Sequence, residues 1–340
     1  MLKRTFIILL VICLSPIAKA QDPQFSQFYA APLYLNPAFA GSTGLARAGL
    51  NYRNQWPSIN ANFVSYSAYF DYYFDDYNSG LGFMVLSDVI GTPALQQNTI
   101  SLQYAYQLPI TPGLTFRPGA QVAAVLGSND FSQYVFGDQY DPGTGLPTNP
   151  TGETGLGGNQ FYMDLAIGGL LYSKNFWFGG AVHHLTEPNQ SFNEGTVSEL
   201  PMKFSLHAGY KIPLKYERNT SFLGAIREVS FTPTIQYKSQ GQFDQLDIGT
   251  YFTYEPLVVG LWYRGLPISS IEGSSGNESV IVLVGLSVNN FNVGYSFDYT
   301  LSELGIRSGG AHELSLSYAF FLGDPSKPPK NKRILPCPKF

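Results

Sequence analysis

Charged residues and long apolar runs are scarce in this chain of 340 residues. Asp, Glu, Lys and Arg together make up 13% of it, which is about half of their usual share in a soluble domain. After Ala20, no window offers the roughly 18 consecutive apolar residues that a membrane-spanning helix needs. The composition therefore excludes a helical membrane protein and disfavours a soluble domain with an ordinary charged surface.

Cysteine is also scarce, with two residues in the chain. Residues 1–20 have two basic residues, an apolar core and a small-residue cleavage motif, which predicts a secretory signal peptide. Cys13 lies inside the apolar core without a small residue before it, so we expect no lipid anchor. The mature chain is expected to begin at Gln21. With Cys337 as its only cysteine, it cannot form an internal disulfide.

The charge that is present is mostly acidic. The formal net charge is −4, and it becomes −7 once the three basic residues of the signal peptide are removed, which excludes a nucleic-acid-binding protein. Aromatic residues reach 15%, and glycine contributes 35 residues. Low charge, abundant aromatic residues, a signal peptide and no helical span together predict an all-β transmembrane barrel of the outer membrane.

Alternation of apolar and polar residues recurs along the chain, as transmembrane strands require. We expect about fourteen antiparallel strands within residues 45–321, near 46–53, 64–72, 81–85, 99–107, 114–122, 161–167, 176–184, 202–210, 229–237, 245–254, 257–264, 280–288, 291–298 and 311–321. An even number of strands places both chain termini in the periplasm.

On each expected strand, polar residues occupy every second position, and these positions would face the barrel interior. The ionisable residues in these segments occupy the same positions. The residues that obey this rule are Arg47, Arg53, Asp71, Arg117, Asp164, Lys203 and Asp247. His312 occupies a position that would face the lipid, but it lies at the start of a strand, where a place at the membrane interface is tolerable. A two-sheet soluble sandwich could mimic the alternation, although it would ordinarily carry more surface charge.

Connections alternate between short and long, as in barrels with short periplasmic turns and longer outer loops. Two gaps break this rule. Residues 211–227 form a long gap where a short turn is expected, and residues 239–241 form a short gap where a long loop is expected. Either a strand is misplaced in this region or the long turn meets a partner.

The chain before the first strand, residues 21–44, predicts an irregular plug or strap. Asn36 and Pro37 favour a turn or an extended backbone, and Gly41 permits a positive φ angle. After the barrel, residues 322–340 form a basic, proline-rich tail with a charge of about +4, whose prolines prevent it from continuing a central strand.

The tail is expected to be an extended periplasmic strap. It could be solvated, or its basic run and aromatic end could bind another protein or the barrel floor. The candidate partner-binding residues are Lys332, Arg333, Cys337 and Phe340.

Catalytic and metal-binding patterns are not recognisable in the sequence. His183 and His184 are adjacent, so on a strand they would face opposite sides and would be interfacial residues rather than ligands of one metal. The acidic, glycine-rich residues 137–158 could bind Ca²⁺ weakly or form a solvated outer loop. We therefore expect no enzyme activity and no cofactor.

Several motifs resemble the PorP/SprF family of outer-membrane proteins, which is associated with the type IX secretion system and gliding motility. The resemblance rests on residues 24–57, QFSQFYAAPLYLNPAFAG followed by NYRNQW, on Ser87-Asp88 with Gly91, and on the closing CPKF. It covers nearly the whole mature chain. The Asn-Pro-Ala element ahead of the barrel is also similar to the plug of long-chain fatty-acid channels, so the resemblance implies a FadL-like fold.

The resemblance implies a role in secreting surface proteins that carry a C-terminal sorting domain, including gliding adhesins, or in retaining them at the cell surface. It also implies partners among the components of the secretion machine: the translocon and periplasmic or lipoprotein subunits. Arg53, Gln55 and Trp56 would then mainly fix the plug and the first strand. The alternatives are a FadL-like channel for a hydrophobic small molecule, gated by the plug, and a purely structural barrel.

Overall fold

A computed structural model describes most of the chain, and the expected signal peptide and the tail residues Lys332, Arg333 and Phe340 lie outside it. The described residues are 22–59, 63–91, 95–129, 135–148, 150–152, 158–192, 195–218, 226–265, 277–301, 305–322 and 335–337. Within these residues, no helix has both the length and the apolar character needed to cross a membrane.

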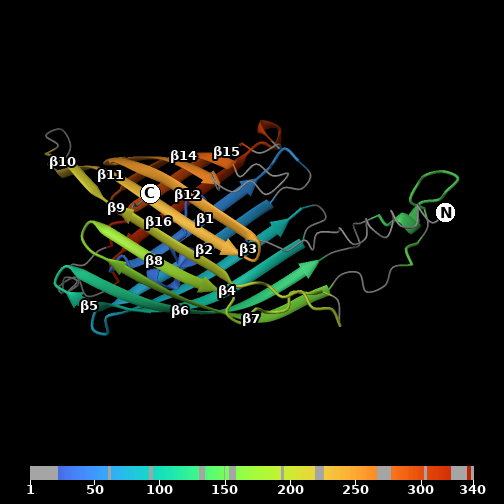
Figure 1. Ribbon diagram of the computed structural model, residues 1–340, viewed down its shortest axis with the longest axis horizontal. Coiled ribbons are helices and arrows are strands. Elements are labelled where there is room, and N and C mark those ends of the chain that lie inside the picture. The colour runs from blue at the N-terminus through green and yellow to red at the C-terminus, as the bar shows by residue number, and fades with distance from the viewer. Residues whose placement is uncertain are drawn as a thin grey trace.

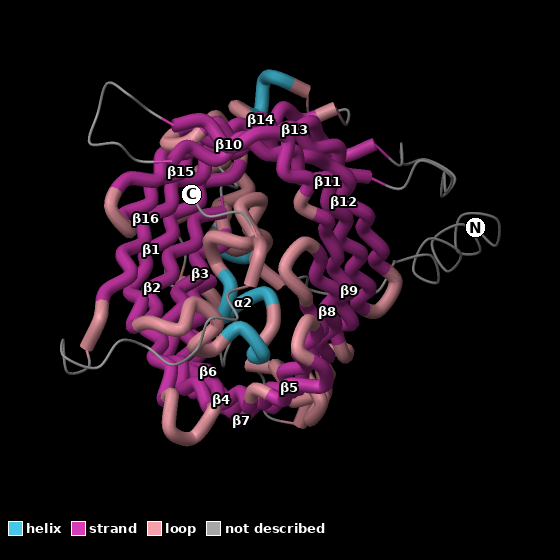
Figure 2. The backbone as a smooth tube through the Cα atoms, turned by 90° about the vertical axis from the view of Figure 1, so that its left-hand side faces the viewer, coloured by secondary structure: helices cyan, strands magenta, loops and turns pink. Residues whose placement is uncertain are grey.

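Fourteen of the described strands form one closed antiparallel barrel (Figures 1 and 2). They are β1 (Ala46–Gln55), β2 (Phe63–Phe74), β3 (Ser79–Ile90), β4 (Leu95–Tyr106), β6 (Leu114–Asn129), β7 (Gly158–Tyr172), β8 (Phe176–His183), β9 (Lys203–Tyr210), β11 (Ile226–Gln240), β12 (Phe243–Tyr254), β13 (Leu257–Gly265), β14 (Asn277–Val288), β15 (Phe291–Thr300) and β16 (Ala311–Phe320). Pairing of β1 with β16 and of β9 with β11 completes the ring. The prediction of about fourteen antiparallel strands is confirmed.

Side chains alternate across the barrel wall as the parity of the sequence predicted. On β1, Leu50 and Tyr52 are exposed on the outside, whereas Asn51 and Arg53 are buried inside. The other charged residues named from parity also face the interior, where Arg47 pairs with the buried Asp71. Large apolar side chains are exposed on strands all around the ring. Such a broad apolar outer surface is expected where the barrel meets lipid.

The two ends of the barrel differ in their connections. Long connections follow β6, β8 and β13 at one end, and turns of two or three residues follow β7, β12 and β14 at the other. We name these the long-loop end and the short-turn end. At the short-turn end, β5 (Leu108–Thr111) pairs with β6 and β10 (Ile212–Arg218) pairs with β11, so both extend hairpins of the wall.

These extensions explain the gap that broke the rule of short turns. Residues 212–218 continue β9 as a further strand, which the sequence did not reveal because its pattern is interrupted. At the long-loop end, β11 and β12 are joined by the tight turn after Gln240. The two features therefore lie on the two sides of one strand, β11, which pairs with β10 and with β12.

The chain before β1 lies inside the ring of strands, where Figure 2 shows its short helix α2 (Pro32–Leu35). A 3₁₀ turn, η1 (Pro37–Phe39), follows α2. We call residues 22–45 the N-terminal segment. It begins beside the long-loop ends of β8 and β9, where Asp22 contacts Lys203, and it reaches the short-turn end at β1. Asp22 and the end of β16 therefore lie at opposite ends of the barrel.

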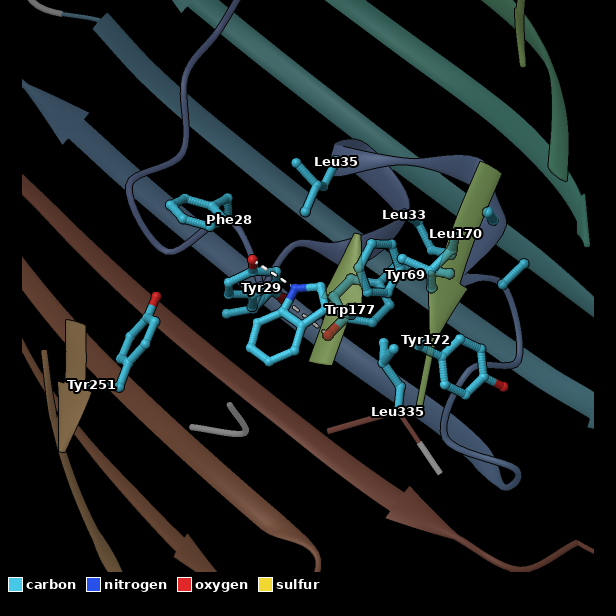
Figure 3. Close-up of a cluster of buried hydrophobic side chains, with 14 of the residues drawn as sticks. Phe28, Tyr29, Leu33, Leu35, Tyr69, Leu170, Tyr172, Trp177, Tyr251 and Leu335 are labelled. Carbon is cyan, nitrogen blue, oxygen red and sulfur yellow. Dashed lines mark hydrogen bonds between the residues drawn. The ribbon is translucent and has the colours of Figure 1, made fainter. Parts of the chain in front are cut away.

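An aromatic core fills the interior between the N-terminal segment and the wall (Figure 3). Trp177 donates a hydrogen bond from Nε1 to the hydroxyl of Tyr29 at 2.9 Å, and Phe28 packs edge-on against Trp262 with ring centroids 4.8 Å apart. Leu335, from the tail, is buried in the same cluster. Residues from both ends of the chain thus pack in the lumen, and burial of their aromatic and apolar area stabilises this arrangement.

Candidate functional site

Asn36 attaches the N-terminal segment to the barrel wall. Its side-chain Oδ1 accepts a hydrogen bond from the backbone N–H of Ala38 at 2.9 Å, which caps η1. Its Nδ2 donates to the carbonyl oxygens of Gly169 on β7 and Gly180 on β8, at 3.1 and 3.0 Å. Since Asn36 is fully buried, these bonds replace all contact of its amide with water. The residue predicted to shape a turn therefore also joins that turn to two strands.

Two inward-facing charges hold the backbone that follows Asn36. The guanidinium of Arg117 on β6 donates from Nε to the carbonyl of Ala38 at 3.2 Å, and from Nη2 to the carbonyl of Ala40. Asp71 on β2 accepts a hydrogen bond from the backbone N–H of Gly41 at 2.7 Å. Gly41 has a φ of +67°, as predicted, which turns the chain toward β1. The NPAFAG segment, residues 36–41, is thus held by a cation and an anion of the barrel wall.

Strand glycines make room for the NPAFAG segment. A Cβ atom at Gly80 would lie 2.0 Å from the carbonyl oxygen of Ala40, and one at Gly119 would lie 2.5 Å from the backbone N of Ala38. At Gly168, a Cβ would lie 2.0 Å from the side-chain oxygen of the capping asparagine. Real Cβ atoms do not approach other atoms this closely. The backbone of the segment therefore packs directly on the backbone of β3, β6 and β7.

Changing Asn36 to Asp is expected to destabilise the protein more than changing it to Ser. Aspartate keeps the cap acceptor but loses both donors, and it places a carboxylate against the carbonyl oxygens of Gly169 and Gly180. An unsatisfied buried polar group costs about 1–3 kcal/mol, and a charged one costs more. Urea unfolding in detergent micelles measures the two variants. Equal stability of Asn36→Asp and wild type would contradict this assignment.

Five buried charges from neighbouring strands form a second contact region, nearer the long-loop end. They are Arg53, Asp247, Arg264, Asp298 and Glu313. Arg53 contacts Asp298 at 2.9 Å and Glu313 at 3.1 Å. Arg264 contacts Asp298 at 3.2 Å and Asp247 at 3.0 Å. Because these side chains are at most 4% exposed, each charge depends on the others for its solvation.

The N-terminal segment supplies the remaining donors to this five-charge network. The backbone N–H groups of Ser26 and Gln27 donate to the two carboxylate oxygens of Glu313, at 2.6 and 3.0 Å. The hydroxyl of Ser26 also donates to Asp298 at 2.5 Å. Three carboxylates face two guanidinium groups, so these neutral donors bind part of the excess acceptor oxygens, while Oδ1 of Asp298 has no partner among the described residues. The first strand and the N-terminal segment are therefore joined through Arg53.

Gln55 and Trp56 continue β1 toward the long-loop end. The side-chain oxygen of Gln55 accepts a hydrogen bond from Arg53 at 3.1 Å. Trp56 has a φ of +58° and packs edge-on against Phe63, with ring centroids 5.3 Å apart. With Arg53 and Gln24, both residues line a cavity of about 760 Å³, which includes space open to solvent. The predicted residues therefore fall into two groups, the NPAFAG segment deep in the lumen and Arg53 to Trp56 toward its mouth.

A smaller ionic cluster holds the start of the N-terminal segment. His184 lies between Asp22 and Asp164, with both nitrogen–oxygen distances at 2.8 Å, and Asp22 also contacts Lys203. Burial disfavours the charged form of Asp22, but Lys203 and His184 bring its pKa well below 3.8. Burial likewise opposes protonation of His184, but the two carboxylates raise its pKa to about 9. His184 is therefore a cation at neutral pH.

This cluster is expected to make stability depend on pH. The pKa of His184 is about 9 in the folded protein and near 6.5 when unfolded, so its contribution is complete below pH 6.5. The contribution is lost as the pH rises through 9. Melting temperatures of wild type and His184→Gln should differ most at pH 6 and converge above pH 9. A difference that stays constant over this range would contradict a charged His184.

The expectation that His183 and His184 face opposite sides is wrong. His184 follows the end of β8 with a φ of +59°, and this left-handed backbone turns its ring to the interior, where His183 is also buried. In the loop of residues 137–158, Asp138 and Asp141 accept hydrogen bonds from backbone N–H groups of the same loop. Glu153 of this loop lies outside the described residues.

The sequence predicted that Asp71, Arg117 and Asp247 face the interior of the barrel, but it did not predict their partners. The glycines that seat the NPAFAG segment were also missed. The signal that could have indicated them is a glycine inside a strand, which weakens the strand unless another backbone approaches closely. Gly80 and Gly119 both have this pattern.

Several solved structures are similar to this chain at low sequence identity. A TodX mutant, a monoaromatic hydrocarbon channel, has 13% identity and a TM-score of 0.45, over 85% of this chain and 94% of that chain. The toluene transporter TodX of P. putida has 11% identity and a TM-score of 0.45, over 85% and 93%. A Pseudomonas aeruginosa FadL homologue has 11% identity and a TM-score of 0.41, over 83% and 93%. A comparison with curated proteins gives no match.

Family membership is shown by the sequence itself. Residues 17–318 match the family model described as type IX secretion system membrane protein PorP/SprF. The match includes the NPAFAG segment, the five-charge network and all strands of the barrel up to the last residues of β16. This chain therefore belongs to the PorP/SprF family of type IX secretion system membrane proteins.

Proposed function

We propose that this protein is a non-enzymatic outer-membrane component of the type IX secretion system. It helps to secrete proteins with a C-terminal sorting domain, such as gliding adhesins, or to retain them at the cell surface. In this role the short-turn end faces the periplasm and the long-loop end faces outward, as is usual for such barrels. Its partners are outer-membrane lipid, the translocon, and periplasmic or lipoprotein subunits of the machine.

One observation supports this proposal beyond the family match: the N-terminal segment packs inside the barrel. Leu33 and Phe39 of this segment are at most 1% exposed, and Leu335 packs in the same aromatic core. A filled lumen suits a protein that holds a client at its mouth. It disfavours the alternative, a gated channel for a hydrophobic small molecule. Passage of such a molecule would require the buried NPAFAG segment to move away from the strand glycines on which its backbone packs.

Affinity purification tests the proposal directly. The tagged mature protein is purified from detergent-solubilised outer membrane, and the proteins that accompany it are identified by mass spectrometry. Recovery of a large secreted protein with a C-terminal sorting domain, or of components of the secretion machine, would support the role. Recovery of the barrel alone with bound lipid or fatty acid would favour the channel. Recovery of the protein from the soluble periplasmic fraction would contradict an integral membrane location.

Two variants separate structural residues from client contacts. Asn36→Ala should lower stability, since Asn36 holds the NPAFAG segment on the wall. Trp56→Ala should act mainly on the first strand and the long-loop end, where Trp56 packs on Phe63. If either variant keeps full stability while client retention is lost, that residue contacts the client directly and its structural role is wrong.

A further inference from the structure

A cavity of about 750 Å³, including space open to solvent, lies at the long-loop end between the N-terminal segment and strands β8, β9, β11 and β12. The N-terminal segment contributes the apolar side chains of Phe25, Phe28 and Leu35 to its lining. The barrel contributes mainly polar side chains from its inward face. The cavity therefore presents both apolar and polar groups to a ligand.

The polar part of the lining contains groups without partners among the described residues. Lys238 forms neither an ion pair nor a hydrogen bond with them. The nearby carboxylate of Asp247 is bound by Arg264 at 3.0 Å, and that of Asp244, at the rim, accepts a hydrogen bond from Tyr237 at 2.9 Å. Lys238 is therefore a cation facing the cavity with no dedicated acid.

Gln236 and His183 add both donors and acceptors. Gln236 is 1% exposed, and neither atom of its amide has a hydrogen-bond partner in the described part of the chain. Both ring nitrogens of the buried His183 are also without partners there. Buried polar groups are normally hydrogen-bonded, and an unpartnered one is unfavourable. These three side chains line the same cavity.

The chemistry of the lining defines the ligand. Lys238 requires an anionic group, Gln236 requires an acceptor and a donor side by side, and the apolar side chains require a hydrocarbon or aromatic group. A carboxylate next to an amide and an apolar side chain satisfies all three. A fatty acid offers the carboxylate and the apolar chain but leaves Gln236 unsatisfied, and a sugar offers no anion.

We propose that this cavity binds the C-terminal residue of a peptide chain, with its α-carboxylate on Lys238, its amide on Gln236 and an apolar side chain against Phe25 and Phe28. The inference rests on the proposed function, since the client would present a free C-terminus at the long-loop end. It adds the part of the client that is recognised and the residues that recognise it.

Fluorescence anisotropy with the purified full-length protein in detergent micelles tests the site. The probe is fluorescein-labelled Gly-Ala-Ala-Leu, either with a free C-terminal carboxylate or as its amide. A charge-assisted hydrogen bond of about 1.5–3 kcal/mol predicts that the acid binds about 10- to 100-fold more tightly than the amide. Octanoate should compete at least tenfold less well than the unlabelled peptide acid.

Variants assign the effect to the cavity. Lys238→Met should abolish the preference for the acid, and Gln236→Leu should weaken the acid and the amide alike. Lys211→Met, which removes a lysine at the short-turn end, is the matched control and should keep the preference. Equal binding of acid and amide to wild type, a preference that survives in Lys238→Met, or stronger competition by octanoate than by the peptide would each overturn the inference.

Purification of the client with the same variants separates the two proposals. If wild type discriminates acid from amide but recovers no secreted protein or machine component, the proposed function fails while the peptide site stands. If the client is recovered equally with wild type and Lys238→Met, and the peptide does not bind, the inference fails while the proposed function stands.

Discussion

Replacing Arg53 with methionine is expected to lower the free energy of unfolding by about 3–5 kcal/mol. Methionine keeps much of the volume but removes the cation that contacts both Asp298 and Glu313. Glu313 then loses the cation that contacts it, and Asp298 keeps only Arg264, in a region almost closed to water. The loss also reaches the N-terminal segment, because Ser26 donates to the same two carboxylates. Denaturant unfolding in detergent, followed by heat-modifiable migration, measures the effect.

Two comparisons make this result specific. Lys211→Met removes an ion pair with Glu228 whose side chains are 29% and 21% exposed, so its cost should be about 0–1 kcal/mol. Adding Glu313→Gln to Arg53→Met should restore part of the lost stability, since it removes one of the uncompensated charges. If Arg53→Met costs no more than Lys211→Met, the network does not join β1 to the N-terminal segment as its geometry indicates.

The barrel could be predicted from the sequence because lipid restricts one face of every strand. An arginine on the lipid face costs about 2–4 kcal/mol at mid-bilayer, so the parity of residues such as Arg53 and Arg117 reports which side is inside. The same parity identified the exposed apolar residues, such as Leu50, and the number of strands around the ring. These predictions need only the local alternation of side chains, which point to opposite faces of a strand at successive positions.

The contacts inside the lumen could not be predicted in the same way. Parity places Arg53 and Glu313 on the inner face, but the pair is 260 positions apart in the chain and meets only because β16 closes on β1. Their contact depends on strand order and register, which a period of two does not encode. The left-handed backbone of His184 was equally hidden, since it is a property of one residue in its tertiary setting.

Adding methyl groups at Gly80 and Gly119 is expected to displace the NPAFAG segment and open the lumen. Both Cβ atoms would meet backbone atoms of the segment, at 2.0 and 2.5 Å. Backbone atoms cannot relieve such a clash by a rotamer change, as a flexible side chain can. Overpacking of this kind costs about 1–3 kcal/mol per site. The backbone hydrogen bonds between the strands of the barrel should persist, because alanine has the same backbone donor and acceptor as glycine. The double variant should therefore still form a heat-modifiable barrel.

Two measurements would show whether the segment closes the lumen. In planar bilayers, the double variant should conduct ions at least about tenfold better than wild type, because displacement of the segment would leave a porin-like opening that fills with water. Cys337, half-buried against the aromatic core, should react faster with a maleimide as that core loosens. Gly113→Ala is the matched control, since a Cβ at Gly113 would meet nothing within 4 Å. If the folded double variant conducts no better than wild type, the lumen stays closed even when the NPAFAG segment no longer packs on Gly80 and Gly119. Closure would then have to come from the five-charge network and the mouth of the barrel.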